Sequence, residues 1–151
     1  MRARPFNHIG PGQNSRFVAP AFATQIAAIE EGRREAVIYV GNLAAKRDFT
    51  DVRDIVRAYR MIVASGQPGE AYNVASGLAY SIQELLDTLL GLSEARIETR
   101  IDSERLRPVD VPEIRGDASK LQRDTGWQPT FTFEQTLHDV LADCRQRIRQ
   151  P

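Results

Sequence analysis

The stretch AVIYVGNLAAKRDFTDVRDIVRAY, residues 36–59, contains the pattern that decides the fold. Its opening residues, 36–40, are mostly β-branched or aromatic and end at Gly41, which predicts a short strand. Asp51 is placed to cap a helix over residues 52–64, where apolar side chains recur along one stripe. A strand, a connector and an amphipathic helix in this order indicate an α/β or α+β domain.

The sequence on either side continues this alternation of short strands and helices. Further strands are predicted over residues 71–74 and 96–101, and Pro5 allows a strand edge or exit over residues 2–6. Further helices are predicted over 17–32, 82–90 and 133–148. A short helix is expected to be capped by Asp117, to run through Thr125 and to be stopped by Gly126. Capping boxes are predicted at Ser81 with Glu84 and at Thr132 with Gln135. The remaining segments, 7–14, 41–51 and 102–116, are expected to be loops because they are rich in glycine, proline or charged residues.

The composition is that of an ordinary globular chain. The 151 residues suffice for one modest domain with a sizeable core. Twenty basic and twenty acidic side chains cancel, so no net field favours nucleic acid or an anionic membrane. A single cysteine, Cys144, excludes an internal disulfide, and no apolar run has the length of a membrane span. We therefore expect a cytoplasmic protein without a nucleic-acid or membrane partner.

Several familiar sites are absent from the sequence. There is no G-x-G-x-x-G dinucleotide fingerprint, and Gly10-Pro-Gly12-Gln is not followed by the Gly-Lys-Ser/Thr of a phosphate-binding loop. No tyrosine is followed by a lysine four positions later. His8, His138 and Cys144 lie too far apart in the chain for a zinc signature, so His138 is expected at the surface and Cys144 in the packing.

The first segment with candidate ligand residues is Arg4-Pro-Phe-Asn-His8. Asn7 and His8 follow a predicted strand and enter a glycine-rich loop. Ligands of α/β sheets sit at the carboxyl ends of strands, which makes both side chains candidates for binding. The alternative is a turn in which Asn7 bonds its own backbone.

The second candidate segment is Gly41–Asp51, which places Lys46 and Arg47 on a connector before a helix. A guanidinium there is suited to a bidentate grip on a diphosphate. The alternative is a surface ion pair, either Arg47 with Asp48 or Arg53 with Asp51.

The third candidate segment is Arg105–Pro112. Arg107 precedes Pro108, which restricts its backbone to extended conformations. Asp110 follows at a spacing that suits ribose hydroxyls while Arg107 holds a phosphate. The alternative is a charged, solvated loop.

Five stretches together carry a resemblance that none carries alone: RPFNHIGPGQ (4–13), VGNLAAKRDFTDVRDIVRAY (40–59), AYNVASG (71–77), RPVDVPEIRGDASKL (107–121) and GWQP (126–129). In order and spacing they resemble the C-terminal half of the extended short-chain dehydrogenases/reductases, the NAD-dependent epimerase/dehydratase family. Within that family they look most like the group of GDP-mannose 4,6-dehydratases and GDP-6-deoxy-D-mannose reductases. NHIGPGQ and RDFTDVRD are more similar to the reductases.

The resemblance implies an α/β fold: the C-terminal part of a Rossmann-type enzyme, mainly its small substrate-binding domain. Residues 1–151 would form a sugar-nucleotide-binding domain, and the N-terminal dinucleotide-binding domain would be absent. The parent enzyme would use NAD or NADP to transfer hydride at a GDP-linked deoxysugar. The tyrosine and lysine that perform its acid–base chemistry precede the first stretch in the family, so the isolated chain is expected to be inactive.

The resemblance also assigns roles to residues. Asn7, Arg47 and Arg107 would contact the GDP-sugar, and Asp110 would reach its ribose. The backbone at Phe6, together with His8, would lie by the nicotinamide end of the cofactor. Dehydratases can carry an arginine near the NADP phosphate where this chain has Gln13, which leaves the choice between NAD and NADP open.

Three readings of the chain follow. It is the substrate-binding half of an NAD(P)-dependent GDP-deoxysugar reductase or dehydratase; alternatively, it is a non-catalytic sugar-nucleotide-binding or interaction module. In the third reading, a separate N-terminal Rossmann half associates with it. We expect no tight binding of a nicotinamide cofactor to this chain alone, and its unpaired sheet edge favours a homo-oligomer.

Overall fold

The computed structural model describes residues 1–102 and 111–150 of the chain. Its elements are β1 (Arg2–Pro5), β2 (Asn7–Ile9), α1 (Val18–Glu30), β3 (Val37–Val40), β4 (Lys46–Asp51), α2 (Val52–Ser65), β5 (Ala71–Val74), β6 (Ala79–Ser81), α3 (Ile82–Gly91), β7 (Glu98–Ile101), β8 (Glu113–Ile114), α4 (Ser119–Thr125) and α5 (Phe133–Arg149). The described part of the chain contains no helix long and apolar enough to cross a membrane. The mixed α/β class predicted from the sequence is confirmed.

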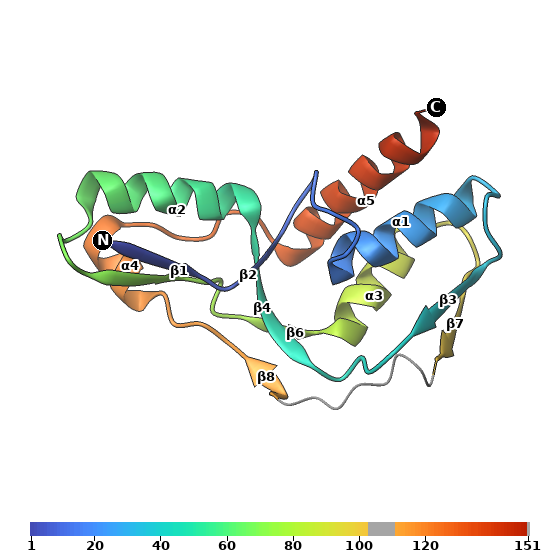
Figure 1. The fold of residues 1–151 in the computed structure, drawn as a ribbon, viewed down its shortest axis with the longest axis horizontal. Coiled ribbons are helices and arrows are strands. Elements are labelled where there is room, and N and C mark those ends of the chain that lie inside the picture. The colour runs from blue at the N-terminus through green and yellow to red at the C-terminus, as the bar shows by residue number, and fades with distance from the viewer. Residues whose placement is uncertain (103–110, 151) are drawn as a thin grey trace.

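The molecule is elongated, with helices gathered at its two ends and short strands between them (Figure 1). One end holds α2 and α4 beside β1 and β5. The other end holds α1, α3 and α5 beside β3 and β7, while β2, β4 and β6 lie in the middle. The buried apolar side chains accordingly form two clusters, not the single core that the chain length suggests.

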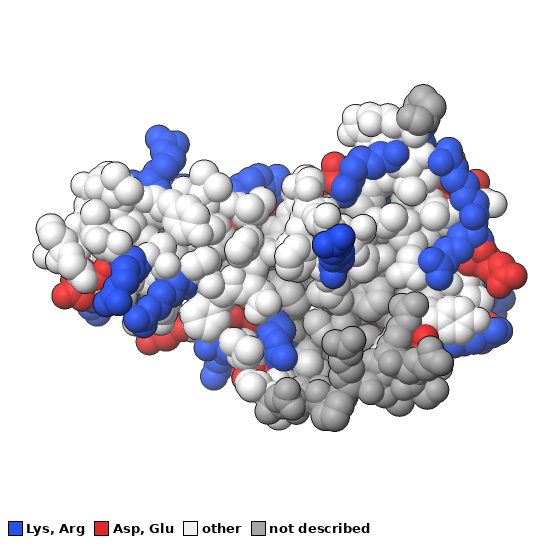
Figure 2. Space-filling view, viewed as in Figure 1, with Lys and Arg blue, Asp and Glu red and all other residues white. Residues whose placement is uncertain are grey.

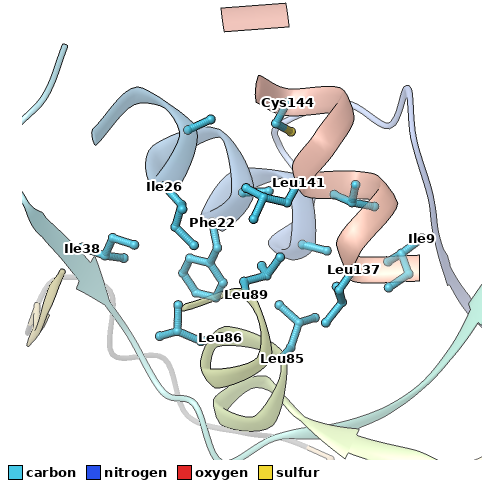
Figure 3. Close-up of a cluster of buried hydrophobic side chains, with 14 of the residues drawn as sticks. Ile9, Phe22, Ile26, Ile38, Leu85, Leu86, Leu89, Leu137, Leu141 and Cys144 are labelled. Carbon is cyan, nitrogen blue, oxygen red and sulfur yellow. The ribbon is translucent and has the colours of Figure 1, made fainter. Parts of the chain in front are cut away.

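The larger cluster lies where α1, α3 and α5 pack together. Figure 3 shows side chains from all three helices converging, joined by Ile9 of β2 and Ile38 of β3. The members labelled there on the helices are Phe22, Ile26, Leu85, Leu86, Leu89, Leu137, Leu141 and Cys144. Each buried leucine or isoleucine contributes roughly 1.5–3 kcal/mol by leaving water, so this end of the molecule has a substantial core. Cys144 is buried in it, as predicted.

The smaller cluster lies between α2, α4 and β5. Tyr72 and Val74 of β5 face it from the sheet, and Ile55 and Ile62 face it from α2. Trp127, which follows α4, is completely buried, and its indole N–H donates to the backbone oxygen of Asp54 at 3.0 Å. The tryptophan therefore joins the end of α4 to the start of α2.

The strands at the two ends match their predictions. β1 and β5 pair in parallel, with Ala3 opposite Tyr72, and β3 and β7 pair in parallel, with Val37 opposite Glu98. Within the described residues, β1 has β5 as its only strand partner. All four residues of β1 are exposed, so its other edge is open to solvent.

The middle of the molecule corrects three loop predictions. Asn7–Ile9 is a strand parallel to β4, with Asn7 opposite Phe49. Lys46–Asp51, predicted as part of a connector, is the central strand β4, which also pairs with β6 and β8. Its mostly polar residues carry no strand signal, although Asp48, Thr50 and Asp51 are buried. Asp48 and Asp51 accept hydrogen bonds from Ser76 and Thr136, which are far along the chain, so their burial depends on the fold. The short strand β8 likewise falls within a predicted loop.

The predicted helix termini are largely confirmed. Asp51 accepts a hydrogen bond from the Arg53 N–H at the start of α2, and both capping boxes form. Gly126 ends α4 in the left-handed region, at φ 73°. One boundary differs: α4 starts at Ser119, and Asp117 accepts from the Ser119 N–H although Ala118 occupies the cap position.

The predicted apolar stripe of α2 divides into two faces. Ile55 and Ile62 are buried, whereas Val56, Tyr59 and Val63 are exposed. We call these last three residues the outer stripe of α2. They are spaced so that they share one side of the helix, which the described chain leaves uncovered.

Charged side chains do not form a single-sign surface on the face seen in Figure 2. Lysine and arginine side chains are scattered over both ends, with acidic side chains near several of them. This distribution agrees with the formal net charge of zero.

Candidate functional site

The candidate site is a cavity of about 580 Å³ where β1 leads into β2. The residues predicted to lie against ligand or cofactor at this point, Phe6, Asn7 and His8, all line it. Asn73 at the end of β5 and Gln13 in the glycine-rich loop line it as well. The cavity thus lies at the carboxyl ends of two parallel strands, where α/β proteins place their ligands.

Phe6 is held from both sides. Its N–H donates to the Val74 oxygen at 2.9 Å, which continues the pairing of β1 with β5. Its ring packs so closely on the backbone of Gly116 that a Cβ built there would lie 3.0 Å from two ring carbons. The same Cβ would lie 2.3 Å from the Cβ of Ala75, so only glycine fits at this position.

Asn7 and His8 lie on β2, at the rim of the cavity. Both are exposed. Within residues 1–102 and 111–150, the Asn7 side chain makes no hydrogen bond, which leaves its amide available. The alternative in which Asn7 turns back on its own backbone is therefore wrong. The Nδ1 atom of His8 lies 3.2 Å from the Phe6 oxygen, while its Nε2 atom has no hydrogen-bond partner among residues 1–102 and 111–150.

Gln13 stabilises the β2 backbone at this rim. Its Nε2 donates to the His8 oxygen at 3.1 Å, which fixes the backbone of β2 against the glycine-rich loop. Its Oε1 is buried and has no hydrogen-bond partner among the described residues. The Gly12 N–H donates to the Asp143 carboxylate of α5 at 2.9 Å, which joins the glycine-rich loop to that helix.

Arg47 lies on β4 and does not line the cavity. Its Nη1 donates to the Val111 oxygen at 3.0 Å and to the Lys46 oxygen at 2.7 Å. The Lys46 N–H donates to the Pro112 oxygen at 2.8 Å beside this contact. The predicted Arg47–Asp48 surface pair is absent, whereas the Arg53–Asp51 pair is present with a closest distance of 2.7 Å. The other donors of Arg47, on Nε and Nη2, have no partner in the described part of the chain.

Arg107 and Asp110 lie outside the described residues. Val111 is the first described residue after them, and Arg47 is bonded to it.

Two residues near the cavity escaped the sequence analysis. Asn73 alternates with the buried Tyr72 and Val74, so a polar side chain on the open face of a strand was the signal that could have found it. Asp48 is fully buried, and its carboxylate accepts hydrogen bonds from Ser76, Gly77 and Gly116. No local pattern marks it, because its partners lie far along the chain.

Of the described residues that line the cavity, His8 carries a side chain suited to acid–base chemistry, whereas Tyr80 does not line it. Tyr80 of β6 stacks on Phe133 with ring centroids 3.9 Å apart. Burial, together with the nearby carboxylates of Glu134 and Glu84, raises the pKa of Tyr80 above its ordinary value. Its stacking on Phe133 and its place outside the cavity lining make this tyrosine a packing residue. The described residues also contain no group of three or more metal-binding side chains.

Comparison with known proteins identifies the family. The family model for GDP-mannose 4,6 dehydratase matches residues 1–140. The chain belongs to this family. It is 38% identical to the GDP-6-deoxy-D-mannose reductase of Pseudomonas aeruginosa over 98% of its own length and 49% of that protein. It is 28% identical to the GDP-mannose 4,6 dehydratase of Drosophila melanogaster, over 97% of this chain and 42% of that one.

Solved structures agree with this assignment to the family. The structure of RMD from Pseudomonas aeruginosa complexed with NADPH superimposes with a TM-score of 0.91 at 38% identity, over 96% of this chain and 48% of that chain. The chain therefore spans about half the length of the relatives it matches. The resemblance read from the five sequence stretches is confirmed, as is the Rossmann-type α/β class.

Proposed function

We propose that this chain forms the GDP-sugar-binding part of an NAD(P)-dependent GDP-deoxysugar reductase or dehydratase. The observation that carries the proposal is the cavity at the ends of β1 and β5, where Phe6, Asn7 and His8 come together. A concave site with apolar walls and a few convergent polar groups is the usual form of a small-molecule site. The higher identity to the reductase than to the dehydratase favours the reductase.

The residues divide between the two ligands of the proposed reaction. Asn7, Arg47, Arg107 and Asp110 bind the GDP-sugar, with the arginines on the diphosphate and Asp110 on the ribose. Phe6 and His8 lie against the nicotinamide end of NAD or NADP, which supplies or accepts the hydride when bound. The half-buried ring of Phe6 and the unpaired Nε2 of His8 fit an aromatic amide in this place. This chain contributes position and orientation, and we do not expect it to hold the dinucleotide tightly by itself.

The exposed outer edge of β1 favours a partner for this function. A strand edge whose N–H and C=O groups are unpaired accepts another strand readily. We propose that a dinucleotide-binding unit, on the same polypeptide or on a separate chain, pairs along this edge and completes the site. A non-catalytic sugar-nucleotide-binding module is the competing function. Nicotinamide turnover in the presence of that unit distinguishes the two.

Calorimetric titration with GDP-mannose tests the binding function directly. We expect Asn7→Ala to weaken binding about tenfold, because it removes a hydrogen-bonding amide from the rim. Arg107→Ala removes a charge-assisted contact to the diphosphate, and we expect a larger loss, roughly 10- to 100-fold.

Arg33→Ala is the matched control. Arg33 is exposed and follows the C-terminal end of α1. The cavity lies at the opposite end of this helix, where Phe17 lines it. Its replacement should leave the affinity unchanged. Equal affinities for wild type, Asn7→Ala and Arg107→Ala would remove these residues from the site. Absence of GDP-mannose binding by the wild-type chain and by its complex with a dinucleotide-binding unit would refute the function.

A further inference from the structure

The completely buried carboxylate of Asp48 has no basic partner among the described residues. Its Oδ1 accepts from the Ser76 N–H at 2.8 Å and from the Ser76 hydroxyl at 2.7 Å. Its Oδ2 accepts from the Gly77 N–H at 2.9 Å and from the Gly116 N–H at 3.1 Å. Three backbone N–H groups and one hydroxyl thus converge on this side chain in the interior. Gly77, at φ 82°, supplies the turn that aims two successive N–H groups at it.

The segments that Asp48 binds do not line the cavity themselves but adjoin residues that do, and we call these segments the cavity wall. Gly116 touches the ring of Phe6, as described above. The next residue, Asp117, accepts a hydrogen bond on its backbone oxygen from the Asn73 side-chain amide at 3.2 Å. The Ser76–Gly77 turn follows Asn73 directly through Val74 and Ala75. A shift of the Gly116 backbone is therefore transmitted to two lining residues, one on each strand end.

We propose that Asp48 is the positioning residue of this cavity. Its carboxylate joins β4 to the turn after β5 and to the segment before α4. It thereby holds Phe6 and Asn73 in the positions in which they would contact the ligand. Asp48 is not in the cavity and touches no ligand itself. The predicted effect of Asp48 on ligand affinity rests on the proposed function. Its predicted effect on the positions of Phe6 and Asn73 does not, because these positions can be measured without a ligand.

Asp48→Asn is the decisive variant, since it keeps the shape of the side chain. An amide replaces one accepting oxygen with an NH₂ group, so either the Ser76 donors or the Gly77 and Gly116 donors lose their acceptor. Asp54→Asn is the matched control. Asp54 is also buried and accepts from the Thr130 N–H and hydroxyl at 2.8 Å and from the Phe131 N–H at 3.0 Å. It lies at the start of α2, whose residues do not line the cavity.

The experiment follows individual amides of the full 151-residue chain by NMR. In Asp48→Asn we expect the backbone amides on one side of the carboxyl group to exchange at least about tenfold faster than in wild type. These are either the amides of Gly77 and Gly116 or the amide of Ser76. The exchange rates of amides in α1 and α5 should stay as in wild type. The resonances of the Phe6 ring and of the Asn73 side chain should move in this variant. In Asp54→Asn these resonances should stay in place, although that protein is also less stable. Unchanged exchange at all three amides in Asp48→Asn, or equal cavity shifts in Asp54→Asn, would overturn the proposal.

Two further measurements cover the remaining outcomes. If Asp48→Asn does not fold, Gly116→Ala takes its place, because the added Cβ displaces the same wall and leaves the carboxylate intact. Undisturbed Phe6 and Asn73 resonances in that variant would overturn the proposal. For ligand affinity, we expect Asp48→Asn to bind GDP-mannose about tenfold more weakly and Asp54→Asn to bind it as wild type does. If the wild-type chain does not bind GDP-mannose, the proposed function is in question and the exchange data alone decide the role of Asp48.

Discussion

The salt bridge between Arg145 of α5 and Glu30 of α1 gives the sharpest test of how the larger core is held. The guanidinium donates to the two carboxylate oxygens at 2.8 and 2.7 Å, and Nη2 also donates to the Leu92 oxygen at 3.0 Å. The Ser93 hydroxyl donates to Glu30 at 2.6 Å. The two charged side chains are only 29% and 17% exposed, so water screens this pair less than a surface pair. The cluster fastens α1, α5 and the end of α3 together.

We predict that Arg145→Ala lowers the free energy of unfolding by about 2 kcal/mol. The variant loses two charge-assisted hydrogen bonds and leaves a partly buried carboxylate with one hydroxyl donor, a loss of roughly 1.5–3 kcal/mol. For a chain of this size, about 2 kcal/mol lowers the melting temperature by about 4–8 °C. Urea and thermal unfolding followed by circular dichroism measure both quantities.

Arg149→Ala is the control on the same helix. Arg149 donates to Glu31 at 2.7 Å, but its side chain is 66% exposed. Exposed pairs contribute about 0.2–1 kcal/mol, so we expect this variant to melt within about 2–3 °C of wild type. Both variants replace an arginine of α5 by alanine, so they make the same chemical change at two levels of exposure.

The acid dependence provides a second check. The hydrogen bond from Arg145 lowers the pKa of Glu30 below its ordinary value of 4.5, against the opposing effect of burial. A lowered folded-state pKa stabilises the protein above the unfolded-state value, and this stabilisation is lost as the pH falls through the folded-state value. The difference between wild type and Arg145→Ala should therefore be full near pH 7 and shrink below pH 4.5. Equal melting of the two alanine variants at pH 7, or a difference that persists at strongly acid pH, would refute this account.

Three further predictions concern activity, association and a helix end. The isolated chain should show no nicotinamide oxidation dependent on a GDP-ketosugar; reproducible turnover in a preparation free of host enzyme would contradict this. The exposed apolar outer stripe of α2 should promote self-association. Val63→Lys should therefore lower the average molar mass measured by light scattering at high protein concentration. An unchanged mass would show that the stripe does not drive association. Gly126→Ala should cost about 1 kcal/mol in urea unfolding because the residue has a positive φ, and unaltered stability would argue against that conformation.

The sequence by itself determined the local structure and the family. Caps, capping boxes and helix-stopping glycines are local signals, since the groups that bond are two to four residues apart. Those at Asp51, Ser81 and Gly126 are where the pattern placed them. Phe6, Asn7 and His8 are consecutive in the sequence, so their common place after β1 also followed from the sequence alone. The site roles of these residues stay predictions.

Only the tertiary structure decided which residues are buried and which distant segments meet. Periodicity gave α2 one apolar stripe, but α4 and Trp127 cover only part of it, so Val63 is exposed while Ile62 is buried. Strand β4 was missed because a run such as KRDFTD resembles a solvated loop until remote donors neutralise its polarity. Asp48 is the clearest case: its donors lie 28, 29 and 68 residues away in the chain, and no local pattern encodes a carboxylate that the fold surrounds with N–H groups.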